Sequence, residues 1–296
     1  VINSVLKCLV CRGHVLLESV PGLAKTLLAR LLTKTVKQAS FQRIQFTPDL
    51  LPTDITGVTV YEKGKGFYTV KGPIFANIIL GDEINRAPPK VQSAMLQAME
   101  ERQVTIGRQT FDLPRPFFVM ATQNPIESSG TYPLPEAQID RFLLKLLMKY
   151  PNFDEEKVVL RQNMNIRSFD SFDIKAVLSP EEIIRMQEDV KMVYTDEKIE
   201  EYIVRIIDAT RNPEKYKIKL GRYIEWGCSP RGSIGLYIAS KAAALIDGKN
   251  FVTPQHVKNV AHAVLRHRII LTYEGIAEGI TTDKIISEVL SKVPVP

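Results

Sequence analysis

The stretch Ser19-Val20-Pro21-Gly22-Leu23-Ala24-Lys25-Thr26 restricts the fold of this chain more than any other feature, because it reads as a phosphate-binding loop. The apolar run Val15-Leu16-Leu17 precedes it, and leucines at helical spacing follow it over residues 27–32. This order of strand, loop and helix is the context that the pattern requires, since backbone N–H groups at a helix N-terminus can surround an anion. We expect Lys25 to reach the terminal phosphates of a nucleotide and Thr26 to offer its hydroxyl to Mg²⁺.

The loop departs from the common pattern at two positions, since Ser19 and Ala24 stand where glycines are usual. A Cβ atom restricts both the backbone angles and the approach of phosphate. We expect Ser19 to be the more strained of the two, so that Ser19→Gly would tighten ATP binding. Alternatively, Ser19 has ordinary extended angles and its hydroxyl caps a nearby amide. The loop alone is also compatible with a plain strand-to-helix turn.

Two further apolar runs end in polar residues. Asp82 and Glu83 follow Ile78-Ile79-Leu80-Gly81, and Asn124 follows the run 117–121. The carboxyl ends of buried parallel strands border the crevice where open α/β sheets bind ligands. We expect Asp82 to hold Mg²⁺, Glu83 to orient and polarise the attacking water, and Asn124 to hydrogen-bond the γ-phosphate. The alternatives are two solvated acids in a loop and an Asn-Pro turn.

Five ordered blocks of the chain resemble the MoxR family of AAA+ ATPases, and the resemblance runs from His14 to the C-terminal end. The blocks are Val20–Thr26, Gln45–Pro52, Gly81–Pro88, Ala121–Pro125 and Thr131–Phe142. The resemblance implies that Asn124 is the sensor-1 residue, that Arg141 is an arginine finger reaching a neighbouring subunit's nucleotide, and that Arg231 is the sensor-2 residue. An arginine finger stabilises the charge that develops during phosphoryl transfer. The alternatives are a local ion pair of Arg141 with Asp140 or Glu136, and a solvated position for Arg231.

The expected fold is α/β, with an AAA+ P-loop core whose parallel sheet is flanked by helices and a small C-terminal all-α lid domain. We place the nucleotide-binding core at residues 1–150 and the lid at 151–296. Alternating β-formers predict a hairpin near 57–72 and a second near 103–116. By resemblance these are the insertions that define this branch, and such loops usually face the pore of a ring or a client.

Helix signals are clear in the second half of the chain. Four helix starts are marked by a capping residue, followed in three of them by proline; they are Ser179-Pro180, Thr195-Asp196, Ser229-Pro230 and Thr253-Pro254. We expect these four helices to form the lid. A further helix is expected over 89–101 in the core, with its methionines filling the core. The histidines at 256, 262 and 267, with Arg266 and Arg268 beside them, are expected on a solvated face.

Composition is that of an ordinary globular protein, with 45% hydrophobic and 24% charged residues in 296. No apolar run approaches the roughly 20 residues of a membrane span, and no signal peptide is visible. The chain begins with Val1, so we expect residues upstream of it, which in the resembling family help to hold adenine. The odd count of three cysteines fits a reducing cytoplasm, and Cys8 and Cys11 are expected to be buried thiols.

We therefore expect an ATP-binding, magnesium-dependent ATPase that works as a homo-oligomer, by resemblance a hexameric ring. The resemblance also implies a chaperone-like role on client proteins, in maturation or cofactor insertion, with a partner that contains a von Willebrand A domain. Two other functions remain open: a nucleic-acid-dependent motor and a nucleotide-binding scaffold with weak turnover. The net charge of +6 permits attraction to nucleic acid, but the positive charge is spread along the chain, so we do not expect nucleic acid as a partner.

Overall fold

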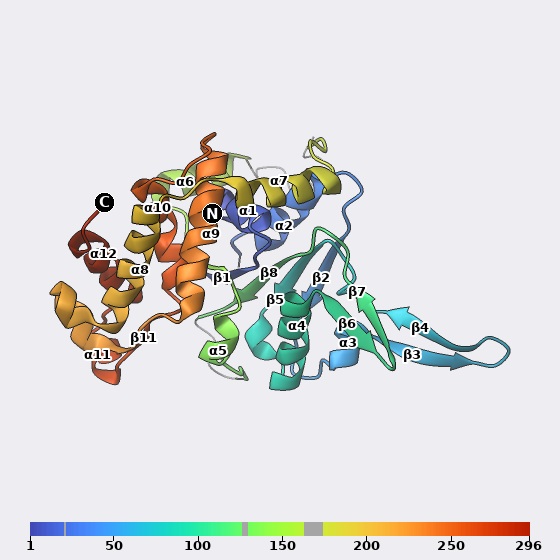
Figure 1. Ribbon diagram of the computed structural model, residues 1–296. Helices are drawn as coiled ribbons and strands as arrows, with labels where there is room; N and C mark the ends of the chain where they lie inside the picture. The colour runs from blue at the N-terminus through green and yellow to red at the C-terminus, as the bar shows by residue number, and fades with distance from the viewer. Residues whose placement is uncertain (21, 126–129, 163–173) are drawn as a thin grey trace. The chain divides into compact units, whose positions relative to one another are not determined.

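The computed structural model describes residues 1–20, 22–125, 130–162 and 174–296 (Figure 1). Pro21, one of the predicted loop residues, lies outside them. The first part of the chain contains α1 (Ile2–Val10), β1 (Val15–Ser19), α2 (Lys25–Lys34), β2 (Phe41–Gln45), α3 (Pro52–Thr56), β3 (Gly57–Glu62), β4 (Gly66–Lys71), β5 (Ile78–Asp82), α4 (Pro89–Glu101), β6 (Gln103–Ile106), β7 (Gln109–Asp112), β8 (Phe118–Gln123), α5 (Glu136–Ile139) and β9 (Leu144–Met148). The second part contains α6 (Phe153–Gln162), α7 (Pro180–Met192), α8 (Glu197–Arg211), β10 (Ile224–Trp226), α9 (Pro230–Ile246), α10 (Pro254–Leu265), β11 (Ile270–Leu271), α11 (Tyr273–Ala277) and α12 (Thr282–Lys292), and short 3₁₀ turns lie at Ile84–Arg86, Pro213–Tyr216 and Lys219–Tyr223.

A five-stranded sheet in the order β2-β5-β8-β1-β9 forms the centre of the α/β fold. The neighbouring pairs β2–β5 and β5–β8 run parallel. All residues of β5 are buried, as are all but the last of β8. Continuous apolar strands of this kind suit a parallel sheet covered on both faces, which explains why the sequence shows no alternation there. The sheet flanked by helices, together with the mainly helical C-terminal part, confirms the expected α/β fold class.

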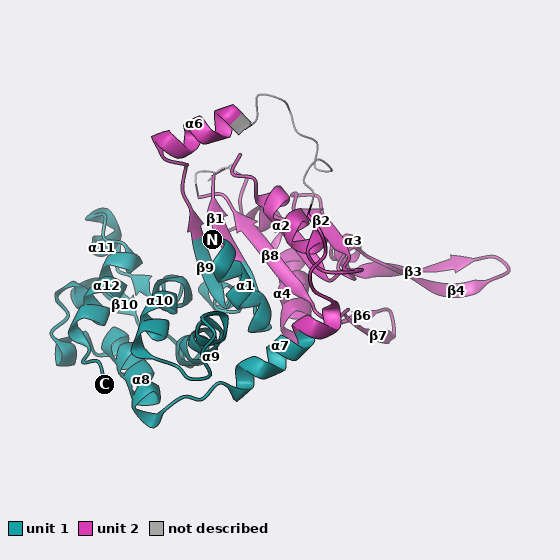
Figure 2. Cartoon of the chain, turned by 90° about the horizontal axis from the view of Figure 1, so that it is seen from above, with its two compact units in different colours: residues 1–15, 135–146, 184–296 teal, residues 16–134, 147–183 magenta. Residues whose placement is uncertain are grey.

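The chain divides into two compact units (Figure 2). The first consists of Val1–Val15, Pro135–Leu146 and Ile184–Pro296, and the second of Leu16–Leu134 and Leu147–Ile183. The predicted division into a core at 1–150 and a lid at 151–296 stays a prediction. The predicted site residues Lys25, Asp82, Glu83 and Asn124 belong to the second unit. Arg141 and Arg231 belong to the first.

Both predicted hairpins are present in the second unit. Strands β3 and β4 pair antiparallel from Gly57↔Lys71 to Glu62↔Gly66, and β6 pairs with β7 from Gln103↔Asp112 to Ile106↔Gln109. The hairpin β3–β4 projects beyond the rest of this unit (Figures 1 and 2). Many of its apolar side chains are exposed, and Phe67 is the most exposed at 78%.

The helix starts expected from capping residues are also confirmed. Asp196 caps α8 by accepting a hydrogen bond from the amide of Lys198, and Ser229 caps α9 by accepting one from the amide of Arg231. Helix α4 has the predicted bounds, and Met95 and Met99 are buried in the core. Strand β2 was not expected from the sequence. Within the described residues, no helix combines the length and the apolar character needed to cross a membrane.

Candidate functional site

The phosphate-loop stretch lies between a strand and a helix, as its sequence predicts. Strand β1 ends at Ser19 and helix α2 begins at Lys25, so Lys25 and Thr26 lie in the first turn of the helix. Gly22 has φ +84° and is exposed, and nothing within 4 Å would meet a Cβ there. The open space and the left-handed angle fit a loop whose backbone approaches a ligand closely. Val20 and Leu23 complete the described part of the loop and are half-buried.

Backbone strain was expected at Ser19, and this expectation is wrong. Ser19 is part of strand β1, whereas Ala24, the residue before α2, has φ 53° and ψ 29°. Left-handed angles cost an L-residue with a Cβ about 1–2 kcal/mol, so the strain lies at Ala24. The Ser19 side chain is buried, and its hydroxyl has no hydrogen-bond partner among the described residues, so it does not cap an amide there.

Asp82 and Glu83 are held together by a residue of the neighbouring strand. The hydroxyl of Thr122 donates to Asp82 Oδ1 at 2.7 Å and accepts from the backbone N–H of Glu83 at 2.9 Å. Thr122 is completely buried. It lies beside Asp82 because of the register in which strand β8 pairs with β5. One side chain therefore fixes both the carboxylate of Asp82 and the backbone of Glu83.

Arg43 of strand β2 also contacts Asp82. Its Nη2 and Nε donate to Asp82 Oδ2 at 2.6 and 3.2 Å. Burial would raise the pKa of Asp82, but the hydrogen bonds from Thr122 and Arg43 and the positive charges of Lys25 and Arg43 outweigh it and lower the pKa. Asp82 is therefore ionised at neutral pH, which a carboxylate ligand of Mg²⁺ requires.

Glu83 has left-handed backbone angles, with φ 57° and ψ 50°. Its Oε2 accepts from Gln45 Nε2 at 3.0 Å and lies 3.2 Å from Arg86 Nε. An L-residue other than glycine rarely adopts these angles, and such residues cluster at functional sites. The side chain of Glu83 is thus oriented by two polar partners at the end of β5.

The remaining predicted site residues lie at two places. Asn124 is buried and directly follows β8, at the same end of the sheet as Asp82. Arg141 follows the short helix α5, and Arg231 lies in the first turn of α9 as predicted. The structure thus brings together Asp82, Glu83 and the neighbouring β8 residues, with Lys25 close enough to affect the pKa of Asp82.

Sequence reasoning missed Arg43, Gln45 and Thr122. Thr122 and Gln45 occur in the blocks that resemble the family, but their hydrogen bonds depend on strand register. It also placed the basic cluster at 266–268 wrongly, since Arg268 is buried and hydrogen-bonds residues 140–143. His256 is buried as well, so these side chains do not share a solvated face.

Comparisons with known proteins agree with this geometry. Residues 14–144 match the model of the ATPase family associated with various cellular activities (AAA), and residues 221–289 match the AAA lid domain. The chain is 46% identical over 290 residues to Chaperone MoxR1 of Mycobacterium tuberculosis, covering 97% of this chain and 76% of that protein. It is 30% identical over 303 residues to Protein MoxR of Paracoccus denitrificans, covering 97% of this chain and 88% of that protein.

The chain belongs to the MoxR family of AAA+ ATPases. A crystal structure of a candidate ATPase from Cytophaga hutchinsonii, 45% identical, superimposes with a TM-score of 0.91 and covers all of this chain and 89% of the other. The MoxR family explains why the phosphate loop, the two acids and the lid occur together. It also agrees with the binding of a nucleotide at the loop before α2.

Proposed function

We propose that this MoxR-type ATPase hydrolyses ATP in a magnesium-dependent reaction at the loop before α2. One observation carries the proposal: Thr122 of strand β8, which pairs with β5, hydrogen-bonds both the carboxylate of Asp82 and the backbone N–H of Glu83. The loop residues Ser19, Val20, Pro21, Gly22, Leu23, Ala24, Lys25 and Thr26 would hold the phosphates.

The residues present suit Mg²⁺, which prefers hard oxygen ligands and binds through one or two carboxylates plus substrate phosphates. Asp82 offers an ionised carboxylate, and Thr26 offers a hydroxyl in the first turn of α2. When bound, the ion neutralises charge on the phosphates. Glu83 would orient and polarise the attacking water, and Asn124 would hydrogen-bond the γ-phosphate and that water.

The two remaining catalytic roles that we propose belong to arginines. Arg141 would act as an arginine finger at the nucleotide of a neighbouring subunit, and Arg231 would contact the phosphates of its own subunit as sensor 2. The start of α9 supports the second role, because Arg231 lies where the helix dipole already favours anions. The role of Arg141 implies a closed homo-oligomer, for which we propose a hexameric ring in the cytoplasm.

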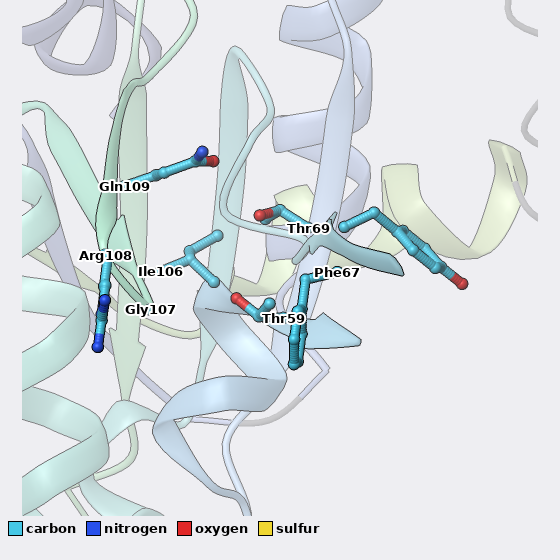
Figure 3. Close-up of a pocket in the computed structure, with 8 residues that line it drawn as sticks. Thr59, Phe67, Thr69, Ile106, Gly107, Arg108 and Gln109 are labelled. Carbon is cyan, nitrogen blue, oxygen red and sulfur yellow. The ribbon is translucent and has the colours of Figure 1, made fainter. Parts of the chain in front are cut away.

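We further propose that ATP turnover remodels client proteins. The relative named Chaperone MoxR1 supports this role. The two hairpins support it too, because a space of about 550 Å³ lies between them, lined by Thr59, Phe67 and Thr69 of one and Ile106, Arg108 and Gln109 of the other. Figure 3 shows Ile106 pointing towards Thr59 and Thr69. We propose a client or adaptor with a von Willebrand A domain, acting in maturation or cofactor insertion.

The hydrolysis proposal is tested by comparing Lys25→Ala with Glu83→Gln. Lys25 contacts phosphate in the ground state, so Lys25→Ala should abolish binding of a fluorescent ATP analogue. Glu83 acts mainly when water is activated, so Glu83→Gln should bind normally and lose turnover. Equal loss of binding in both variants would contradict the role of Glu83. Activity that requires added DNA would favour a nucleic-acid motor.

The client proposal uses the Glu83→Gln protein as a trap. A purified protein with a von Willebrand A domain should be retained in the presence of ATP, and retention should fall when Phe67→Ser is added to the trap. Trp226→Ser, which changes another exposed aromatic side chain in the other unit, is the matched control. Equal retention by all three trap proteins would contradict the hairpin as the client-binding element.

A further inference from the structure

Arg268, which follows helix α10, is a buried arginine whose hydrogen bonds converge on one short segment. Its side chain is 3% exposed. A guanidinium has five N–H donors, and five hydrogen bonds are made. The acceptors are Asp140 Oδ1 at 2.7 Å and the carbonyl oxygens of Asp140 at 3.1 Å, Phe142 at 2.8 Å, Leu143 at 3.2 Å and Val264.

Four of the five acceptors belong to residues 140–143, and these residues enclose Arg141. The guanidinium donates to the carbonyl oxygen of Asp140, which precedes Arg141, and to those of Phe142 and Leu143, which follow it. The backbone from which the Arg141 side chain extends is therefore fixed on both sides. Lysine cannot do this, because its ammonium group is a point donor and not a planar fork.

The neighbouring residues of the same turn bind the same stretch of chain. His267 Nε2 lies 3.0 Å from the carbonyl oxygen of Phe142, and Arg266 Nη1 donates to the carbonyl oxygen of Lys145 at 2.8 Å. Burial and the charge of Arg268 lower the pKa of His267 well below its usual value, so the ring is neutral and donates its Nε2–H to the carbonyl oxygen. The turn after α10 thus follows the backbone from 140 to 145.

The second carboxylate oxygen of Asp140 extends this network to the start of α9. Ser229 Oγ donates to Asp140 Oδ2 at 2.8 Å and accepts from the amide of Arg231 at 3.2 Å. One carboxylate therefore connects Arg268, which holds the backbone around Arg141, with the helical turn that carries Arg231. All of these residues lie in the first unit.

A buried ion pair seldom stabilises a fold more than apolar residues of the same volume, so stability is a weak explanation for this one. The acceptors suggest a different use, since three of them are carbonyl oxygens on the two sides of Arg141. We propose that Arg268 is a positioning residue for Arg141, and that Asp140 and Ser229 couple Arg141 to the first turn of α9. This inference rests on the proposed roles of Arg141 and Arg231.

The test is Arg268→Lys, which keeps the charge and removes the fork. The loop before α2 is unchanged in this variant, so its affinity for a fluorescent ATP analogue should equal that of the wild type. Its kcat should fall by about 10- to 100-fold, because misplacing a group by about 1 Å can cost about a hundredfold in rate. Mixing it with Lys25→Ala protein should restore activity, since those subunits supply a well-placed Arg141 to intact loops.

Arg266→Lys is the matched control, because Arg266 binds the same stretch at Lys145 and pairs with Asp283, away from Arg141. It should keep the wild-type kcat. Thermal unfolding shows whether each variant is folded. If Arg268→Lys does not fold, Asp140→Asn replaces it, since the amide keeps an oxygen towards Arg268, removes the charge and presents an NH₂ group that cannot accept from Ser229 Oγ. A reduced kcat is then expected again.

Arg141→Ala separates failure of this inference from failure of the proposed function. If Arg141→Ala mixed with Lys25→Ala gains no activity although mixed assemblies form, the role of Arg141 across a subunit boundary is wrong. The inference then stands only if Arg268→Lys still matches Arg141→Ala in affinity and in kcat. A wild-type kcat for Arg268→Lys would overturn the positioning role, as would a loss that mixing fails to restore when it restores Arg141→Ala.

Discussion

Ala24 and Glu83 hold left-handed backbone angles at the two turns of the candidate site. In both residues the strain lies directly beside a proposed ligand contact, before Lys25 in one case and after Asp82 in the other. Such strain persists only where the surrounding structure fixes it. At Glu83, Thr122 supplies that restraint through the backbone amide.

The strain at Ala24 predicts that Ala24→Gly stabilises the protein. Relief of the left-handed angle yields about 1–2 kcal/mol, and the greater freedom of glycine in the unfolded chain offsets about 0.5–1 kcal/mol. The free energy of unfolding in urea should therefore rise by about 0.5–1 kcal/mol. Gly22→Ala is the reverse control and should destabilise, since Gly22 has φ +84° in open space. A loss of stability in both variants would contradict the assignment of strain to Ala24.

The hydrogen bond from Thr122 predicts a pH-dependent effect of Thr122→Val. Asp82 has a lowered pKa in the folded protein, so it contributes stability above its unfolded pKa of about 3.9, and this contribution is lost as the pH falls through the folded value. Thr122→Val removes part of it. The difference in free energy of unfolding between wild type and variant should be constant from pH 5 to 7 and should narrow towards pH 3. A difference that is independent of pH would mean that Thr122 acts only through packing and the Glu83 amide.

At the scale of elements, strand β2 was not expected, and it supplies the contacts of Arg43 with Asp82 and of Gln45 with Glu83. Its sequence Phe-Gln-Arg-Ile-Gln has mostly exposed side chains and lies at one edge of the sheet, so no apolar run reveals it. The strands before Asp82 and Asn124 could be predicted, because buried parallel strands are continuous apolar runs. Arg43 and Gln45 could not, since their contacts depend on the register between β2 and β5.

The same limit explains the other errors. A sequence pattern identifies where glycine is missing, but it does not give φ. It therefore could not show that the left-handed residue is Ala24 and not Ser19. Arg268 was expected on a solvated face because consecutive basic residues usually are exposed. Three of its five acceptors are carbonyl oxygens more than 120 residues earlier in the chain, and carbonyl oxygens leave no trace in a sequence.

The ion pair between β2 and β5 predicts how Arg43→Gln changes the magnesium dependence. Arg43 and Mg²⁺ would compete for the same carboxylate of Asp82. A partly exposed ion pair is worth about 0.5–1 kcal/mol, so the Mg²⁺ concentration for half-maximal ATPase activity should fall about two- to fivefold. Lys37→Gln, an exposed change of equal charge, should leave it unaltered. An increase in the required concentration would show that Arg43 instead helps Asp82 to hold the ion.

At the scale of the whole molecule, the cysteines report on opening of the first unit. Cys8 and Cys228 are buried, and Cys11 is half-buried. Burial raises the pKa of Cys11 to about 12 and that of Cys228 to about 11, and it raises the pKa of Cys8 well above its usual value. Burial of Cys8 agrees with the expectation from the sequence.

These pKa values predict slow labelling of the native protein by an aromatic disulfide reagent at pH 8. The thiolate is the reactive form, and it is scarce in all three cysteines until the unit opens. All three should react within seconds in urea and far more slowly in native buffer. Rapid native labelling of Cys8 or Cys228 would show that the first unit opens locally around that thiol.

The projecting hairpin β3–β4 has a consequence for the behaviour of the protein in concentrated solution. It is a two-stranded sheet with a ring contact between Tyr61 and Phe67, and Val58 and Val70 are exposed as well. Open strand edges with apolar side chains are templates for aggregation through strand addition. Lys63 and Lys65, which lie in the turn between the two strands, act as charged gatekeepers against it. Colloidal stability should therefore fall with rising salt, and the hairpin is the part of the chain where aggregation would begin.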